Sequence, residues 1–348
     1  MANRTFTARA SGKVNVHLGC GWPRSDGYHD LVTIFQAVDL ADEVSIELFD
    51  DSIGGIHGPL QVSGPTATGV PDDESNLVWK AIELVHQRFS ELFPALVGLK
   101  QQPALRVAIV KNIPAAGGMA GGSADAAAAL IAANAAFGAW YEKGDVAGSR
   151  KQEAPALDRE TLRDLAAQLG ADVPFCLLGG TALGTGRGDV LTPVLARGTF
   201  HWCFIASQEG LSTPKVFKKL DELRESASLA GDQQRLDALA PHLDTSAVSQ
   251  AVTTGDCEQL ARAMRNDLQA ASFSLRPSLR TIIDLGQESG ALRGMVSGSG
   301  PTIALLCPSA AIAREVRDII VTEVPGTRGF VTTSPARGAR LVDSNDWK

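Results

Sequence analysis

The sequence has few cysteines, and it spaces them widely. Its 348 residues include five cysteines and no Cys-x-x-Cys pair. An odd number of distant cysteines argues against a disulfide scaffold and against a zinc cluster, and the six histidines show no metal-ligand spacing. We therefore expect no structural metal and a reducing, cytoplasmic location. The cysteines are Cys20, Cys176, Cys203, Cys257 and Cys307.

The chain also lacks a basic surface and a membrane segment. Lys and Arg number 32 against 39 Asp and Glu, a formal net charge of −7, whereas nucleic-acid binding usually needs a broad positive field. The first sixteen residues contain no apolar signal-peptide stretch. The most apolar segment, residues 124–140, is interrupted by Asp125 and Asn134 and is too short to span a bilayer. We expect neither a nucleic-acid partner nor a membrane.

Hydrophobic residues make up 44% of the chain, which indicates a globular protein with substantial cores. Strands and helices alternate irregularly, which favours an α+β class over a regular βαβ series. We place a domain boundary near residue 196, giving domains at residues 1–196 and 197–348. Residues 142–156 and 226–244 are polar and are predicted to be irregular. Periodicity and turn residues predict strands at residues 5–10, 13–19, 31–40, 43–49, 105–111, 174–178, 181–184, 190–193, 201–206, 294–297, 302–307 and 329–333, and helices at 76–89, 123–137, 159–169, 214–224, 258–271, 279–288 and 310–321. Ser11 and Gly12 predict a turn between the first two strands, and Ser75 is a candidate N-cap of the first helix.

The strongest local signal is a glycine-rich segment that leads into an alanine-rich helix. Four glycines, at positions 117, 118, 121 and 122, free the backbone to approach a ligand. The first amides of the helix are unpaired and lie at its positive end, so the segment is a candidate phosphate cradle, with Ser123 as N-cap. It is neither a Walker A loop nor a Rossmann fingerprint. The alternative is a tight turn whose glycines serve packing alone.

Two polar groups near the N-terminus are further candidates. Lys13 and Asn15 stand two residues apart on a predicted strand, so they share a face. Tyr28 and His29 follow the turn at Asp26, and they offer a stacking ring and a hydrogen-bonding ring. Taken singly, the lysine could be a solvated edge charge and the aromatic pair an ordinary polar turn.

A third group lies in the segment LGADVPF, residues 169–175. Asp172 follows a predicted helix end, and Pro174 disfavours helix at the residue before it, so the aspartate sits in a short fixed connection. A carboxylate entering an apolar stretch needs a partner. The alternative to a functional role is that Asp172 is a structural helix cap. The turn SGSGPT, residues 297–302, adds glycines between two predicted strands.

In this order, the motifs resemble the GHMP kinase superfamily. Its pattern P-x-x-x-G-x-x-x-G-S-S/A matches residues 114–124, and its C-terminal glycine motif matches residues 297–302. The segments GKVN (12–15), DGYH (26–29) and LGADVPF (169–175) resemble a branch of that superfamily whose members phosphorylate a cytidine-diphosphate-linked methylerythritol in the non-mevalonate isoprenoid route.

The resemblance implies a two-domain α+β fold with the active site in the cleft between the domains, and transfer of the γ-phosphoryl group of ATP, with Mg²⁺, to the 2-hydroxyl of that substrate. It implies Asp172 as catalytic base and Lys13 as its partner. It assigns substrate contacts to Asn15, Tyr28, His29 and Phe217. It assigns the ATP phosphates to the glycine loop, which comprises Pro114, Ala115, Ala116, Gly117, Gly118, Met119, Ala120, Gly121, Gly122, Ser123 and Ala124.

The chain departs from the branch within the glycine loop. Many relatives have GGGLGGGSSN where this chain has AGGMAGGSAD. The replacement places Asp125 close to the phosphates, where it could assist Mg²⁺ or act as a helix-start carboxylate.

The sequence leaves three other functions open. One is another GHMP kinase for homoserine or mevalonate, which DGYH disfavours. The others are a non-catalytic GHMP-fold sensor, which Lys13 and Asp172 disfavour, and a Rossmann dehydrogenase, which the missing fingerprint disfavours.

Overall fold

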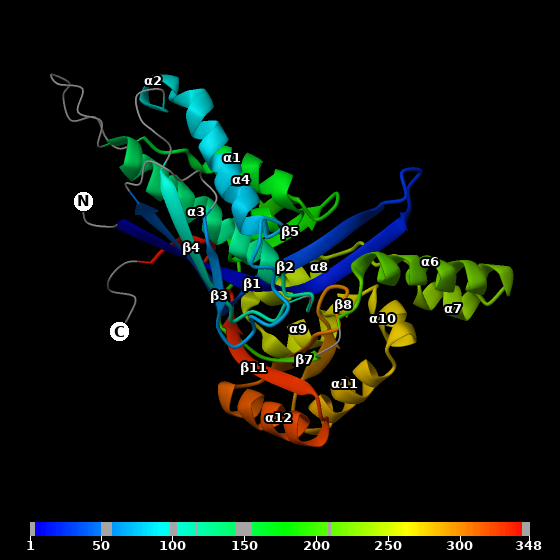
Figure 1. The fold of residues 1–348 in the computed structure, drawn as a ribbon. Helices are drawn as coiled ribbons and strands as arrows, with labels where there is room; N and C mark the ends of the chain where they lie inside the picture. The colour runs from blue at the N-terminus through cyan, green and yellow to red at the C-terminus, as the bar shows by residue number, and fades with distance from the viewer. Residues whose placement is uncertain are drawn as a thin grey trace.

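Two β-sheets and the helices that cover them build the molecule (Figure 1). The computed structural model describes residues 4–49, 58–97, 103–115, 117–142, 155–207 and 210–342. Ala116 and most of the predicted loop at residues 142–156 lie outside these ranges. The described helices include none with the length and hydropathy needed to cross a bilayer.

The larger sheet carries the N-terminal half of the chain. Its strands follow the order β12-β1-β2-β4-β3, while β5 pairs with β2 and β6, and β8 pairs with β1. Its two long strands, β1 and β2, form an antiparallel hairpin that extends beyond the sheet. The strands are β1 (Arg4–Pro23), β2 (His29–Phe49), β3 (Leu60–Ser63), β4 (Ala104–Val110), β5 (Thr181–Thr185), β6 (Val190–Pro193), β8 (Arg265–Asn266) and β12 (Arg340–Leu341).

The smaller sheet has the strand order β11-β7-β10-β9. Along β7 the side chains alternate between two cores. Trp202 and Phe204 join the core of the larger sheet, whereas Cys203 and Ile205 join a second core with residues of α11 and α12. Both faces of this sheet are therefore buried. The strands are β7 (Phe200–Ser207), β9 (Arg293–Val296), β10 (Ile303–Cys307) and β11 (Thr327–Ser334).

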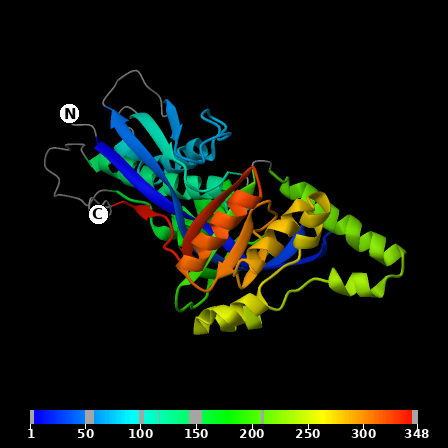
Figure 2. The same ribbon diagram turned by 90° about the horizontal axis from the view of Figure 1, so that it is seen from below.

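Helices pack on both sheets, and some extend beyond them (Figures 1 and 2). Helix α3 packs on β1 and β2 and is covered by α1 and α4, while α12 packs on the smaller sheet. Helices α6 and α7 project beside the β1–β2 hairpin. The helices are α1 (Leu77–Leu92), α2 (Pro94–Val97), α3 (Gly121–Glu142), α4 (Arg159–Leu169), α5 (Val173–Leu178), α6 (Thr213–Leu229), α7 (Gln233–Ala238), α8 (Ser246–Thr254), α9 (Cys257–Ala263), α10 (Gln269–Leu275), α11 (Ser278–Glu288) and α12 (Ala310–Glu323).

Three predictions about strands and helix starts are wrong. The expected turn at residues 11–12 lies within the single strand β1, where Ser11 pairs with Ala41 and Gly12 with Val38. The extra residues of this register shift belong to β2, so the chain of β1 continues without reversing. The predicted strand at 174–178 is helix α5, since Pro174 lies in the first turn, where its missing N–H costs nothing. Asn76, not Ser75, caps α1 and accepts a hydrogen bond from the Val78 amide at 3.0 Å.

The remaining differences lie around the glycine loop and in the C-terminal half. Helix α3 begins at Gly121, so Ser123 stands inside the helix and is not its N-cap. The predicted helix at residues 258–271 is two helices, α9 and α10, separated by the short strand β8. Helix α8 was not predicted, and the segment 226–244, expected to be irregular, contains the end of α6 and all of α7. The strands predicted at 31–40 and 43–49 are one continuous strand, β2, and the other predicted elements are present with small shifts at their ends.

Candidate active site

A cavity of about 530 Å³ brings most of the predicted residues together. It lies where β1, the start of α3, the start of α5 and the turn between β9 and β10 meet. Of the residues predicted from the sequence, those lining it are Lys13, Asn15, Gly117, Gly118, Ala120, Gly121, Gly122, Ser123, Asp172 and Phe217.

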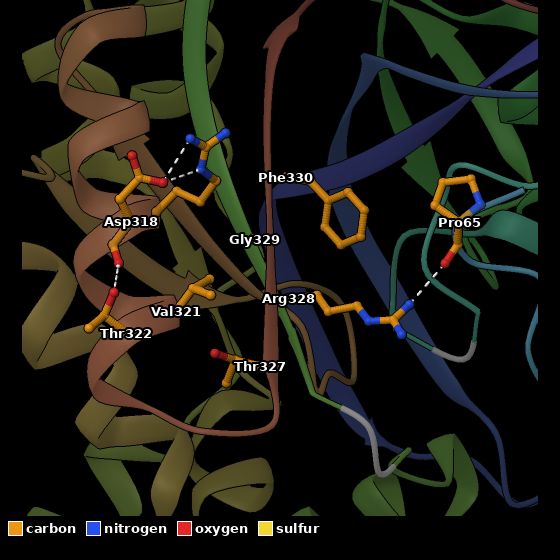
Figure 3. A pocket seen from close by; sticks show the side chains of 9 residues that line it. Pro65, Asp318, Val321, Thr322, Thr327, Arg328, Gly329 and Phe330 are labelled. Carbon is orange, nitrogen blue, oxygen red and sulfur yellow. Dashed lines mark hydrogen bonds and ion pairs between the residues drawn. The ribbon is translucent and has the colours of Figure 1, made fainter.

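A larger hollow of about 820 Å³ lies elsewhere, between α12, β11 and Pro65 (Figure 3). It contains none of the predicted residues. Its charged groups already have partners, since Arg328 donates to the carbonyl oxygen of Pro65 at 2.9 Å and Arg317 pairs with Asp318 at 2.7 Å. The smaller cavity, not this hollow, is the candidate active site.

Lys13 lies at the centre of the cavity wall. Its side chain is only 6% exposed, and its Nζ atom lies 3.7 Å from Oδ2 of Asp172. The same Nζ donates to Oδ1 of Asn15 at 2.7 Å, so the two-residue spacing does place both side chains on one face. A buried ammonium needs such partners, because desolvation alone would disfavour its charge.

Asn15 is held in turn by a chain of hydrogen bonds. Its Nδ2 donates to Oγ1 of Thr33 at 2.8 Å, and that hydroxyl donates to the backbone carbonyl of His17 at 2.6 Å. Thr33 comes from β2, so the hairpin pairing fixes the whole chain of contacts. Because its amide nitrogen donates to Thr33, the side-chain oxygen of Asn15 faces Lys13.

Asp172 precedes the first residue of α5, at the position of its N-cap. Its side chain makes no capping hydrogen bond to the helix and is 35% exposed. A structural cap would accept from an amide in the first turn. The carboxylate instead faces the cavity, with its nearest charged partner 3.7 Å away. It is therefore free to accept a proton from a bound hydroxyl.

The glycine loop interlocks with the turn between β9 and β10. Gly118 has φ +77°, and a Cβ there would meet the carbonyl oxygen of Ser297 at 2.0 Å. The Ser297 hydroxyl donates to the Gly118 carbonyl at 3.2 Å. Gly298, with φ +57°, approaches so closely that a Cβ would lie 3.3 Å from Nζ of Lys13. Only glycine fits these two backbones.

The loop then runs into α3, whose first residues line the cavity. A Cβ added to Gly122 would meet no atom within 4 Å, so this residue faces open space. Ala120 stands just before the helix with φ +60°, a left-handed conformation that favours glycine. The unpaired amides of such a helix start attract anions. Pro114, Ala115, Met119 and Ala124 do not line the cavity, and Met119 and Ala124 belong to the core.

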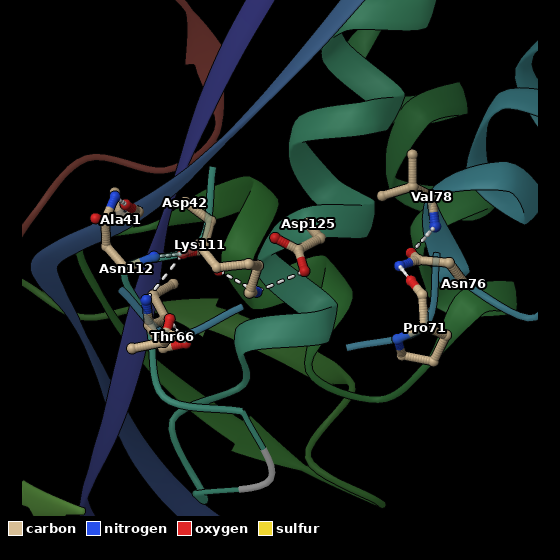
Figure 4. A network of polar contacts seen from close by, with 10 residues as sticks. Ala41, Asp42, Thr66, Pro71, Asn76, Val78, Lys111, Asn112 and Asp125 are labelled. Carbon is tan, nitrogen blue, oxygen red and sulfur yellow. Dashed lines mark hydrogen bonds and ion pairs between the residues drawn. The ribbon is translucent and has the colours of Figure 1, made fainter. Parts of the chain in front are cut away.

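A buried ion network lies beside the start of α3 (Figure 4). The Lys111 ammonium donates to Oδ2 of Asp42 and, at 2.6 Å, to Oδ2 of Asp125. Asp42 also accepts from the amides of Asn112 and Ile113 at 2.6 and 2.8 Å. Burial, which outweighs the attraction of Lys111, raises the pKa of Asp125 to about 7.

Asp125 therefore has neither of the roles weighed from the sequence. It is 2% exposed and does not line the cavity, which removes it from the space where phosphates and Mg²⁺ would lie. The first turn of α3 contains no acidic residue, so Asp125 is not a helix-start carboxylate either. It is one member of the buried ion network with Lys111 and Asp42.

The second group of predicted residues lies at the far end of the hairpin. His29, from the start of β2, contacts Phe217 of α6 with ring centroids 5.2 Å apart and planes at 34°. Nε2 of His29 lies 2.9 Å from Oδ1 of Asp221, also on α6. Tyr28 is 56% exposed on the hairpin turn, and among the described ring contacts it pairs with neither His29 nor Phe217.

Sequence reasoning missed several polar residues of this region. Thr33 and Arg187 line the cavity, and Asp221 pairs with His29. Thr33 stands in an apolar strand, where a lone threonine gives no signal. Arg187 stands in the glycine-rich stretch after α5, where no neighbouring residue marks it as part of a site. Asp221 is four residues after Phe217, a spacing that places both on one helix face.

Comparison with known proteins identifies the family. The GHMP kinases N-terminal domain matches residues 76–180, and the GHMP kinases C-terminal domain matches residues 248–325. The 4-diphosphocytidyl-2-C-methyl-D-erythritol kinase of Corynebacterium efficiens is 45% identical, with 97% of this chain and 98% of that protein covered. The enzyme of the same name from Nocardia farcinica is 46% identical, with 96% and 95% covered.

A solved structure agrees with these relatives. The crystal structure of a 4-(cytidine 5′-diphospho)-2C-methyl-D-erythritol kinase superposes with a TM-score of 0.66 and 27% identity, covering 96% of this chain and 99% of the other. The predicted α+β GHMP kinase fold is confirmed, and so is the prediction of a small-molecule kinase. The chain belongs to the GHMP kinases and, within them, to the family of the 4-diphosphocytidyl-2-C-methyl-D-erythritol kinases.

Proposed function

We propose that this kinase transfers the γ-phosphoryl group of ATP to the 2-hydroxyl of 4-diphosphocytidyl-2-C-methyl-D-erythritol, a step of non-mevalonate isoprenoid precursor synthesis. One observation carries the proposal: an uncapped carboxylate, Asp172, faces the same cavity as the glycine loop, 3.7 Å from a buried ammonium, Lys13. The names of the full-length relatives supply the substrate.

Asp172 is the general base in this proposal. The acceptor is a tertiary alcohol, a crowded and weak nucleophile, and a carboxylate within hydrogen-bond reach takes its proton as the bond to phosphorus forms. Lys13 keeps a positive charge beside that carboxylate and offsets charge on the transferred phosphoryl group. Asn15 holds the Lys13 ammonium in place through the 2.7 Å hydrogen bond.

The glycine loop and the start of α3 hold the ATP phosphates. Phosphoryl transfer depends chiefly on positioning and charge stabilisation. Backbone amides at residues 117–123 and the positive end of α3 supply both without a Walker lysine. The open space at Gly122 leaves room for the phosphates at this point.

Mg²⁺ accompanies the nucleotide in this proposal. Mg²⁺ commonly binds substrate phosphates, one or two carboxylates and several waters, so a dedicated protein cage is not required. The described residues contain no group of three potential His, Cys, Asp or Glu ligands, but Asp172 and Ser123 place oxygen donors in the cavity. The ion would neutralise phosphate charge during transfer.

The cytidine end of the acceptor lies towards the hairpin and α6. Phe217 lines the cavity and contacts His29, which does not itself line the cavity. In this proposal the base stacks on Phe217 with its edge towards the imidazole. Tyr28 supplies a second ring face from the exposed hairpin turn.

We also propose the division into domains at residues 1–196 and 197–348. Each domain then contains a single sheet, apart from the short strands β8 and β12, which belong to the larger sheet but lie in the second domain.

An ATP-consumption assay tests the function. The purified chain is given the cytidine-diphosphate substrate, homoserine or mevalonate in separate reactions, and ADP release is followed. We expect turnover with the first substrate alone. Preferred turnover of homoserine or mevalonate would assign another GHMP kinase activity, and no turnover with any acceptor would favour a non-catalytic sensor.

A further inference from the structure

His29 lies between an aromatic ring and a carboxylate of the same helix. Its side chain is 5% exposed, and its Nε2 lies 2.9 Å from Oδ1 of Asp221, whose side chain is 34% exposed. Its ring contacts Phe217, one turn earlier on α6, at 5.2 Å between centroids. Phe217 lines the active-site cavity. Helix α6 thus presents an aromatic face and an acceptor to one imidazole.

The helix that carries Asp221 is fixed in place. Arg224, one turn later, is 2% exposed, and its guanidinium donates to three backbone carbonyls, those of Leu239, Gly21 and Cys20, at 2.8–2.9 Å. Two of these carbonyls belong to β1, so α6 is tied to the hairpin that carries His29. Trp22 covers the guanidinium at 4.7 Å. The Asp221–His29 contact is therefore fixed by the packing of α6 against the hairpin.

A carboxylate partner decides where the imidazole holds its proton. An ionised carboxylate only accepts, so Nε2 of His29 must donate to it. In a neutral ring, Nδ1 is then left with a lone pair and can only accept. Nδ1 of His29 has no hydrogen-bond partner among the described residues and is not one of their buried unpaired atoms. It is the one polar ring atom left for a ligand.

An acceptor at Nδ1 distinguishes the two pyrimidines. Cytosine carries an amino group at C4, which donates, whereas uracil carries a carbonyl oxygen there, which accepts. Stacking on Phe217 does not separate them, because every base has a similar face. We propose that Asp221 is the residue that sets this selectivity: it holds the tautomer of His29 that accepts from a cytosine amino group and repels a uracil carbonyl.

This inference rests on the proposed function, because it assumes a cytidine-containing acceptor. Asp221 is a positioning residue, since it acts on the base only through His29. The test compares the wild-type enzyme with Asp221→Asn and Asp221→Ala. An amide can donate to Nε2 and reverse the tautomer, as known for carboxylate–histidine pairs, and alanine leaves the ring free to take either form. Glu222→Gln is the matched control, because Glu222 is the next residue of α6 and pairs with Lys219 on the surface.

The first measurement is spectroscopic. Nitrogen-15 shifts of the His29 ring, assigned by comparison with His29→Ala, report which nitrogen carries the proton. We expect the wild-type enzyme and Glu222→Gln to show a protonated Nε2 and a bare Nδ1, and Asp221→Asn to shift proton occupancy to Nδ1. A doubly protonated ring in the wild-type enzyme, or the same tautomer in Asp221→Asn, would overturn the proposal.

The second measurement is the selectivity itself. An unpaired polar edge corresponds to about a 5- to 150-fold loss of affinity. We expect the ratio of kcat/KM for the cytidine and uridine forms of the acceptor to fall by such a factor in both Asp221 variants, through KM, and to stay unchanged in Glu222→Gln. Calorimetry with cytidine 5′-diphosphate and uridine 5′-diphosphate gives the same ratio without turnover.

The two readouts separate this inference from the proposed function. If the enzyme fails to phosphorylate the cytidine-diphosphate acceptor, yet Asp221→Asn still narrows the cytidine over uridine preference in calorimetry, the selectivity role stands and the reaction does not. If turnover is normal and the ratio is unchanged in both Asp221 variants, the reaction stands and the selectivity role is wrong.

Discussion

The Oδ2 atom of Asp172 lies 3.7 Å from the Nζ atom of Lys13, beyond ordinary hydrogen-bond length. The ammonium instead makes its close hydrogen bond to Asn15, at 2.7 Å. The carboxylate therefore has a positive charge beside it without being locked to it, and it makes no helix-capping bond. This arrangement suits a base, which must stay ionised until it accepts a proton from the substrate.

Asp172→Asn should remove the base and little else. We expect kcat to fall by about 10²- to 10⁴-fold, the usual contribution of a general base, with nucleotide affinity nearly unchanged because the glycine loop is a separate element. Steady-state kinetics and calorimetry with ATP check both points. Asp164→Asn, at an exposed position of α4, is the control. Near-normal kcat in Asp172→Asn would remove this residue from the chemistry.

Gly122→Val tests whether the loop holds phosphates. A Cβ at this position meets no protein atom, so the fold should tolerate the side chain while the space for phosphates is reduced. We expect ATP affinity to fall by roughly tenfold or more, which corresponds to about 1.4 kcal/mol, with an unchanged melting temperature. Unchanged calorimetric affinity in the folded variant would contradict the cradle.

Gly118→Ala gives a contrasting outcome in the same loop. Its Cβ would meet the Ser297 carbonyl at 2.0 Å, and its φ is +77°. We therefore expect this variant to be less stable than the wild-type protein, whatever its affinity for the nucleotide. Thermal unfolding would show a lowered midpoint for Gly118→Ala and not for Gly122→Val. Equal midpoints would mean that the glycine loop and the β9–β10 turn are not in close contact.

Much of the site could be predicted from the sequence, because its strongest signals are local. The glycine loop, the two-residue spacing of Lys13 and Asn15, and the segment around Asp172 each carry their meaning within a few residues. The buried ion network could not be predicted, since Asp42, Lys111 and Asp125 meet only when β2, the residues after β4 and α3 pack together. Tertiary pairing leaves no periodic pattern in the sequence.

The fold errors have a similar physical origin. An apolar run such as residues 173–178 has no polar face, so its periodicity cannot distinguish strand from helix. Pro174, a helix breaker elsewhere, is compatible with the first turn where it stands. Ser11 and Gly12 are typical of a turn, but pairing along the whole of β1 and β2 keeps both within β1, opposite a register shift whose extra residues lie in β2. In the second case, strand pairing over the whole hairpin outweighed the local turn propensity of these two residues.

Ala120→Gly should stabilise the protein. Ala120 has φ +60°, a conformation that costs a non-glycine residue about 1–2 kcal/mol. Glycine avoids this cost, but it loses more backbone entropy on folding, which lowers stability by roughly 0.5–1 kcal/mol. We expect the free energy of unfolding to rise by about 0.8 kcal/mol, the difference between the centres of these two ranges. Urea titration measures it. Ala115→Gly, in the same loop but without a positive φ, should instead lower stability; equal effects of the two substitutions would contradict the strain at Ala120.

The buried network makes stability depend on pH through Asp125. Burial raises the pKa of Asp125 to about 7, from an ordinary value of 3.8. Between these two values the folded state holds a proton that the unfolded state has released, so the free energy of unfolding must fall as pH rises. This contribution is fully present below about pH 4 and is lost as pH rises through 7. Its slope is at most about 1.4 kcal/mol per pH unit, the value for one proton.

Asp125→Asn removes this titrating group while keeping its size, and the relatives with GGGSSN carry asparagine at this position. We expect the stability of the variant to be flatter than that of the wild-type protein between about pH 5 and 7. The pair formed by Lys111 and Asp42 remains to hold the ammonium. Urea titrations at pH 5, 6 and 7 give the two slopes, and Asp318→Asn, on the surface of α12 with a 68% exposed side chain, is the control. If the wild-type protein and Asp125→Asn keep the same slope, Asp125 does not hold a proton in the folded state, and the network must be a fully ionised cluster of one lysine and two carboxylates.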